Sequence, residues 1–426
     1  MTPATVPFTV PIRYRLIAVS FSLSMLLYID RVAISTAKGP ITTAFDLDDT
    51  SFGWVLSAFA LGYALCQTPA GALADRWGAR VMLTAVVTVW SLFTGLTGLA
   101  WSFGSLLALR FLFGVGEAGA YPTLARAFYS WLPAGERGLA QGINVSGSRI
   151  GAALALPAVA WFVTAVGWRQ AFVWLGAAGI AWALAWYAWF RDSPAEHPHV
   201  SAAELHVIRA GGSAPATTSL HPLRVSSILR SMNMWILMSQ YFALNFTFFF
   251  CLTWLFPHLQ RTYHLEALQT GLLASAPLLG GAVGNWVGGA LVDRLYRSGR
   301  VVLSRRLPAM LGFVLSATGL LASLAFNDPI AVVLCLTLAV FGADLALPAS
   351  WALCIDIGRA HTGIVAGTMN MAGNIGAFVT SLAFPYLLLL TGSTSPFFVL
   401  GAVLNLASVG LWLGVDPARP VSDSRD

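Results

Sequence analysis

Long apolar runs dominate this chain and leave few folds open to it. Each run is at least as long as the ~20 residues that one helical crossing of a bilayer needs. The runs lie at residues 12–37, 52–74, 81–101, 103–129, 138–165, 168–190, 233–258, 270–292, 305–326, 329–356, 361–390 and 395–415. Only 10% of the 426 residues are charged, whereas soluble domains carry about 25%. The sequence therefore predicts an all-α membrane protein with twelve transmembrane helices, and its first run is too long to be a cleavable signal peptide.

The formal net charge of +6 invites a nucleic-acid interpretation, but the placement of the positive residues favours a membrane topology instead. Eighteen arginines fall in the two tails, in alternate connections between the runs and at the run ends next to them, whereas the opposite side holds Lys38, Arg169 and Arg261. Cytoplasmic loops of membrane proteins carry such an excess of positive charge. We therefore expect both termini in the cytoplasm and no nucleic-acid partner.

Three arginines remain, and all of them lie inside apolar runs: Arg31, Arg110 and Arg149. Asp30 directly precedes the first of them. A charge at mid-bilayer costs about 2.5 to 3.5 kcal/mol on insertion scales, and such residues usually face a bundle interior or a pathway. These side chains are therefore the first candidates for a functional site.

The longest polar stretch, residues 191–231, divides the twelve runs six and six, as a linker between two halves would. Two motifs recur across it: 71–76 (GALADR) returns as 289–294 (GALVDR), and 144–151 (NVSGSRIG) returns one residue shorter as 370–376 (NMAGNIG). Transporters built from two parallel six-span repeats hold substrate near mid-membrane between the repeats. We predict an N-terminal bundle at 1–190, a cytoplasmic linker at 191–232 and a C-terminal bundle at 233–426.

Residues 71–80 (GALADRWGAR) resemble the loop signature of the major facilitator superfamily, between its second and third spans. Over residues 12–415 the chain also resembles that superfamily's anion:cation symporter family, which includes bacterial sugar-acid and phthalate transporters and sialin-type carriers. The matching segments are 28–31 (YIDR), 110–122 (RFLFGVGEAGAYP), 131–133 (WLP), 136–138 (ERG) and 167–169 (GWR). Residues 254–257 (WLFP) depart from the usual Trp-Leu-Pro by a phenylalanine. The resemblance implies two pseudo-symmetric six-helix bundles, the major facilitator fold.

In the resembling family, the span-one arginine binds the substrate carboxylate, and the span-one aspartate and span-four glutamate are proton sites. The span-four arginine links those two acids. The matching residues here are Arg31, Asp30, Glu117 and Arg110. Independently, Arg110 and Glu117 are two helical turns apart and so share one face, and membrane burial disfavours the charged form of a carboxyl. The alternative is a static salt-bridge cluster between the first and fourth spans, although buried pairs are weak evidence for stability.

Further candidates are polar or aromatic side chains inside the runs. The predicted substrate contacts beside Arg31 are Tyr28, Tyr63, Ser148, Arg149, Asn245, Ser350, Trp351, Asn370 and Asn374. Arg149 either contacts substrate, takes part in gating, or snorkels to the cytoplasmic interface. Either asparagine of the eleventh run could instead serve helix packing.

Acids near the ends of the runs, and one in the tenth run, complete the predicted site. We expect Asp75, Arg76, Asp293 and Arg294 to latch the two halves in an outward-facing state. Asp344 has no evident partner, and it is either a second proton site or a residue facing a wet cavity. Asp356, near the end of the tenth run, is expected to cap or bridge there with Arg359.

These features predict a secondary active transporter that imports a small organic anion, such as a sugar acid or another carboxylate, by proton-coupled symport. The charges of Asp30, Arg31, Arg110, Glu117 and Arg149 sum to +1 when ionised, so an anion and a proton bound together leave that charge unchanged. The alternatives are an organic-anion exchanger or exporter on the same scaffold and, as a different class, a non-transporting membrane sensor. The sensor is disfavoured because the linker and tails are short.

We expect no enzyme activity, because the runs hold no nucleophile–base or metal constellation. The four cysteines show no metal-like spacing. Residues 114–119 fit a dinucleotide fingerprint, but no strand precedes them in a βαβ unit. The predicted partners are therefore a small organic anion, protons and the lipid bilayer, with no cofactor and no metal, and we expect a monomer.

Overall fold

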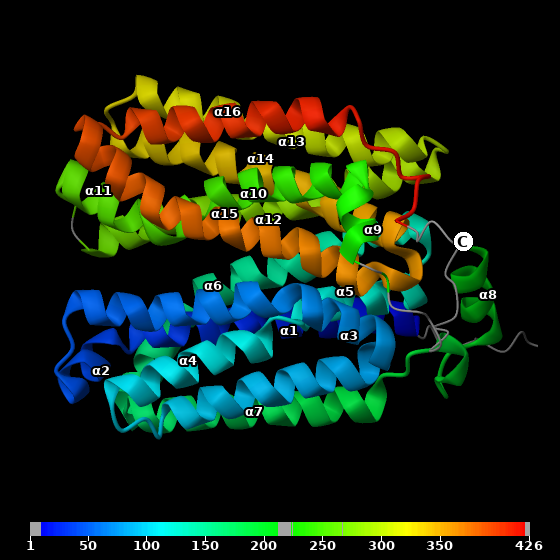
Figure 1. Cartoon of the computed structure of the whole chain (residues 1–426), viewed down its shortest axis with the longest axis horizontal. Coiled ribbons are helices and arrows are strands. Elements are labelled where there is room, and N and C mark those ends of the chain that lie inside the picture. The colour runs from blue at the N-terminus through cyan, green and yellow to red at the C-terminus, as the bar shows by residue number, and fades with distance from the viewer. Residues whose placement is uncertain (1–9, 212–222, 224, 266, 422–426) are drawn as a thin grey trace, which may run out of the picture.

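The computed structural model describes residues 10–211, 223, 225–265 and 267–421, and the regular elements in those ranges are helices (Figure 1). The helices are α1 (Ile12–Thr36), α2 (Lys38–Phe45), α3 (Asp49–Thr97), α4 (Phe103–Glu117), α5 (Ala120–Trp131), α6 (Arg137–Val166), α7 (Trp168–Trp189), α8 (Ala202–Ala210), α9 (Val225–Arg230), α10 (Met232–Thr253), α11 (Leu255–Tyr263), α12 (Ala267–Arg297), α13 (Val301–Ala322), α14 (Pro329–Gly358), α15 (Thr362–Thr391) and α16 (Ser395–Trp412). Short 3₁₀ turns lie at Ala134–Glu136, Pro194–Glu196, Ser323–Ala325 and Arg359–His361.

The predicted crossings map onto these helices, although some helices run together and others are broken. On length and composition, eight helical stretches among the described residues can cross a membrane. Two of them, Ser51–Thr97 and Pro329–Thr391, have 47 and 63 residues and are each long enough for two crossings. α6 and α12, with 30 and 31 residues, supply the remaining two crossings. Inside α3 the chain turns at Gly78, whose φ of 78° is one that glycine adopts without steric cost.

The transmembrane helices form two bundles that lie side by side (Figure 1). α1 to α7 make up one bundle and α10 to α16 the other, with α6 packed on α12 and α3 packed on α15 across the interface. A Cβ at Gly142 of α6 would collide with the carbonyl oxygen of Asn285 in α12, so small residues allow the two backbones to touch there. The limits of the halves at residues 190 and 233 stay a prediction.

Two carboxylates join the bundles at the end that carries the arginine-rich connections. Asp75 accepts hydrogen bonds from the backbone N–H groups of Gly363 and Ile364, at 2.7 and 2.9 Å, in the first turn of α15. Asp293 accepts from Gly138 and Leu139, both at 2.8 Å, in the first turn of α6. The amides of a first helical turn lack partners in their own helix and favour an anion. Each half therefore binds the first turn of a helix in the other half through one carboxylate. We call these two contacts, made by Asp75 and Asp293, the latches.

The arginines next to these acids do not share the contact, because Arg76 and Arg294 are exposed. The expected pairing of Asp356 with Arg359 is wrong. Asp356 instead contacts Arg305 at 2.7 Å and Arg137 of α6 at 3.6 Å, because Arg359 has a φ of 49° outside the helix and is exposed. The Arg137–Asp356 pair is a third link between the bundles at this end.

The helix α8 lies outside both bundles at the same end (Figure 1). Its Glu204 accepts from the backbone N–H groups of Ile12 and Arg13, at 3.1 and 3.0 Å. These amides open α1, so Glu204 satisfies donors that would otherwise have no partner. The segment between the halves is thus tied to the start of the first transmembrane helix.

Candidate functional site

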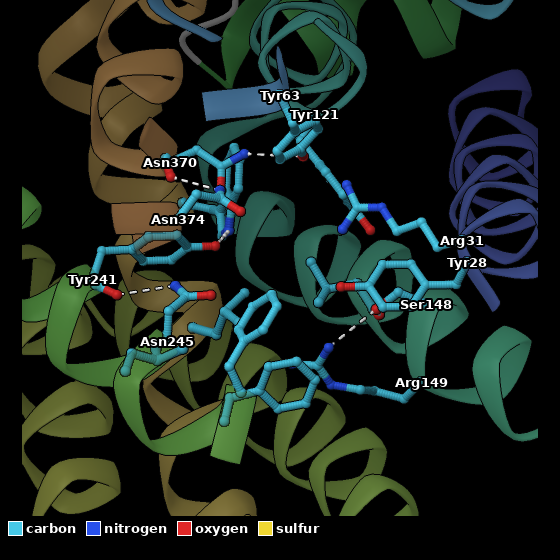
Figure 2. Close-up of a pocket in the computed structure, with 16 residues that line it drawn as sticks. Tyr28, Arg31, Tyr63, Tyr121, Ser148, Arg149, Tyr241, Asn245, Asn370 and Asn374 are labelled. Atoms are coloured by element: carbon cyan, nitrogen blue, oxygen red, sulfur yellow. Dashed lines mark hydrogen bonds between the residues drawn. The ribbon is translucent and has the colours of Figure 1, made fainter. Parts of the chain in front are cut away.

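A small cavity of about 40 Å³ lies between the two bundles (Figure 2). Its lining comes from α1 (Tyr28, Arg31), α3 (Tyr63), α5 (Tyr121), α6 (Val145, Ser148, Arg149), α10 (Tyr241, Leu244, Asn245, Phe248, Phe249), α14 (Leu347, Trp351) and α15 (Asn370, Asn374). That volume holds a few water molecules, so a larger ligand has to displace side chains on entering. Nine of the ten predicted substrate contacts line this cavity.

Ser350 is the predicted contact that does not line the cavity. Its hydroxyl lies 3.2 Å from both the side-chain oxygen of Gln240 and the carbonyl of Ala346, and the residue is fully buried. Trp351, the next residue, lines the cavity. Neighbouring positions of a helix point about 100° apart, so only one of the two faces the centre.

Arg31 connects the cavity to a buried acid. Its Nε and Nη2 both lie 2.6 Å from Oε1 of Glu117 in α4. The rings of Tyr28 and Tyr63 lie 5.0 and 4.5 Å from its guanidinium carbon, within range of cation–π attraction. The Arg31 side chain is 14% exposed and that of Glu117 only 1%. The arginine thus faces the cavity, and the glutamate lies behind it.

Asp30 points to a different neighbour from the same helical turn. Its Oδ2 accepts a hydrogen bond of 3.1 Å from the indole N–H of Trp90 in α3, and the residue is 1% exposed. Arg110, 2% exposed, lies within electrostatic reach of both Asp30 and Glu117 and packs on Phe113 at 4.4 Å. The four charged residues predicted from spans one and four therefore lie together.

This cluster leaves hydrogen-bonding capacity unused. Among the described residues, Oδ1 of Asp30, Oε2 of Glu117 and Nε of Arg110 have no hydrogen-bond partner. Buried polar atoms in a purely structural network normally have hydrogen-bond partners. These three unpartnered atoms therefore favour a working site over a static salt bridge. A carboxyl oxygen without a partner is also a position where a proton can sit.

Arg149 does not snorkel, and Asp344 does have a partner. Nε and Nη2 of Arg149 in α6 each donate to an oxygen of Asp344 in α14, both at 2.8 Å. Arg149 also stacks on the ring of Phe248 at 3.5 Å. The partner escaped sequence analysis because the two residues are 195 positions apart and belong to different halves.

The C-terminal bundle supplies a polar and aromatic wall to the cavity. Trp351 donates from its indole nitrogen to the Tyr241 hydroxyl at 3.2 Å. Asn370 reaches the Tyr63 hydroxyl at 3.5 Å, and Asn374 donates to the Asn370 carbonyl at 2.8 Å (Figure 2). Both asparagines of the eleventh run therefore border the cavity.

Four aromatic side chains of the cavity were missed from the sequence: Tyr121, Tyr241, Phe248 and Phe249. Tyr241 and Phe248 are four residues before and three residues after Asn245, so the face shared with a predicted contact was a usable signal. Tyr121 in α5 lies one helical turn after Glu117. It belongs to segment 110–122, in which Arg110 and Glu117 were singled out from the sequence.

Comparisons of this chain with a family model and with individual relatives point to the same kind of protein. A family model described as Major Facilitator Superfamily matches residues 20–379 and 242–426. A probable sulfoacetate transporter of Cupriavidus necator is 36% identical over 419 residues, which cover 97% of this chain and 96% of the relative. A probable galactarate/D-glucarate transporter of Escherichia coli is 32% identical over 395 residues, 88% of each chain.

A solved structure shows the same architecture. A proton:xylose symporter bound to 6-bromo-6-deoxy-D-glucose has a TM-score of 0.77 against this chain. The likeness covers 94% of this chain and 95% of that one at 13% identity, which establishes the fold alone. Together with the family match, it confirms the predicted all-α fold of twelve transmembrane helices in two bundles.

Proposed function

This chain belongs to the Major Facilitator Superfamily, and on that basis we propose that it imports a small organic anion together with protons. The observation that carries the proposal is the Arg31–Glu117 contact at the wall of the central cavity. A planar guanidinium is suited to bind a carboxylate through two nitrogens, and here its present partner is a carboxylate of the protein.

Substrate and proton binding are coupled by competition for that arginine. An incoming acid group takes the place of Glu117 on Arg31. Removing one member of a buried pair costs about 3–5 kcal/mol if the other stays charged, so the released Glu117 takes up a proton. Asp30, with one oxygen unpartnered, is a further proton position, and Arg110 lies within electrostatic reach of both acids. The wall formed by Tyr241, Trp351, Asn370 and Asn374 then receives the rest of the substrate.

The relatives support an acid as cargo, because they are named as probable transporters of sulfoacetate and of galactarate or D-glucarate. We place the carrier as a monomer in the bacterial inner membrane with both termini cytoplasmic. The latched end, which carries the arginine-rich connections, is then the cytoplasmic end. Asp75 and Asp293 act as gates that hold this end closed, and the halves comprise residues 1–190 and 233–426 with a cytoplasmic linker between them.

Reconstituted vesicles test this function. The purified protein is expected to accumulate labelled sulfoacetate or galactarate when the outside is made acidic. Glu117→Gln should reduce this gradient-driven accumulation by at least about tenfold, while exchange of internal for external anion continues. The control is Glu196→Gln, which neutralises an exposed acid of the segment between the halves.

Three outcomes contradict the proposal. If the native protein transports neither sulfoacetate nor galactarate, the organic-anion function is contradicted. Uptake that needs internal anion but no proton gradient would identify an exchanger. Normal accumulation by both Glu117→Gln and Asp30→Asn would contradict the assignment of coupling protons to these two acids.

A further inference from the structure

The cavity holds a second arginine–carboxylate pair that resembles the first but joins the two halves. Arg149 in α6 binds both oxygens of Asp344 in α14 at 2.8 Å. Their side chains are 4% and 0% exposed. Arg149 lines the cavity, and Asp344 lies behind it. As with Arg31 and Glu117, the arginine borders the cavity and the acid lies behind the arginine, away from the cavity.

Holding α6 against α14 does not explain this pair well. The same two helices are already joined by Arg137 and Asp356 at the latched end. A buried ion pair adds little net stability, because the desolvation of both charges offsets their attraction. What the pair does provide is a bidentate guanidinium at the cavity wall, and such a fork suits another acid group equally well.

We propose that Arg149 binds a second acid group of the substrate, so that the carrier selects small dianions with an acid group at each end. This inference rests on the proposed function, in which Arg31 binds the first acid group. The second acid group takes over the two donor nitrogens of Arg149. Asp344 leaves the pair and binds one proton, and no covalent bond to carbon forms or breaks.

The surroundings of Asp344 make the proton necessary. Arg149 faces it from α6, and the thiol of Cys251 in α10 lies within its electrostatic reach. On the side of α12, a Cβ at Gly281 would collide with its Oδ2. Among the described residues that contact it, Arg149 is the one that carries a charge. An isolated ionised carboxylate in such a dry place is costly, and it becomes neutral instead.

Charge balance gives the number of protons. The sequence-based sum of +1 omitted Asp344. With it, three acids and three arginines cancel when all are ionised: Asp30, Glu117, Asp344, Arg31, Arg110 and Arg149. A bound dianion brings two negative charges, and two protons return the centre to zero. The structure thus assigns one proton to each acid group of the cargo, on Glu117 for the first and on Asp344 for the second.

The test compares substrates that differ by one acid group. Galactarate is paired with galactonate, and sulfoacetate with acetate, in the same proteoliposomes. The decisive variant is Arg149→Gln combined with Asp344→Asn, which removes both charges and leaves no buried ion unpaired. Native protein is expected to favour each diacid over its monoacid by at least tenfold in half-saturating concentration, and to bring in two protons per diacid. The double variant should lower that preference at least tenfold and bring in one proton.

The matched control is Arg137→Gln, which removes the other α6–α14 ion pair and leaves Asp356 with Arg305. Its preference for diacids should equal that of the native protein. The inference is overturned if native protein does not prefer the diacids, if the double variant keeps the preference, or if Arg137→Gln changes it equally. If the native protein transports none of the four compounds, the proposed function itself is contradicted.

Discussion

The two carboxylate latches allow a quantitative prediction for the equilibrium between closed and open forms. Asp75 receives two amides of α15, and Asp293 receives two amides of α6, at distances between 2.7 and 2.9 Å. In Asp75→Asn the remaining oxygen can accept one of the two amides, and the new NH₂ group faces the other. Losing one hydrogen bond to a charged group costs about 1.5–3 kcal/mol. A central value of about 2 kcal/mol shifts the equilibrium toward the open form roughly thirtyfold, because 1.4 kcal/mol is a factor of ten.

Asp293→Asn should have the same effect because its contact has the same geometry. The two latches share no partner, so the double variant should shift the equilibrium by about 4 kcal/mol. Spin labels at Trp77 and Val301, exposed positions of opposite halves, would report the opening as a change in distance distribution. Asp48→Asn is the control, because Asp48 caps its own helix through Ser51 at 2.7 Å. An unchanged distribution in both single variants, or a shift in only one of them, would refute the reasoning.

Three further predictions concern the cavity and the interface. Arg31→Lys keeps the charge but loses the two-nitrogen contact, so substrate affinity measured by ligand-induced thermal shift should fall at least about tenfold; an affinity within twofold of native would contradict its role. Gly142→Ala places a Cβ against the Asn285 carbonyl and should lower the free energy of unfolding by about 1–3 kcal/mol, whereas Gly410→Ala, with open space around it, should not. Ser350→Ala should leave affinity within about twofold while Asn370→Ala weakens it, because only Asn370 borders the cavity; counterflow at several substrate concentrations distinguishes the two.

The sequence by itself determined the membrane character, the crossings and the place of the buried charges. Hydropathy and charge are properties of a continuous segment, so they can be read without knowing what the segment packs against. Asp30 and Arg31 were conspicuous because a charge in an apolar run is costly wherever the helix lies. The repeated GALADR and GALVDR motifs likewise predicted that Asp75 and Asp293 would behave alike, and both meet the first turn of a helix in the opposite half.

Only the tertiary structure decided which charges meet. The role of Arg149 was left open between substrate contact, gating and snorkelling, and Asp344 had no evident partner, until α6 and α14 were placed against each other. Asp356 pairs with Arg305 and Arg137 rather than with its sequence neighbour Arg359. α14 is apolar over most of its length, so no amphipathic pattern reveals its rotation, and Ser350 and Trp351 could not be separated in advance. Pairing between halves depends on helix rotation and depth, and these are set by packing between residues far apart in the chain.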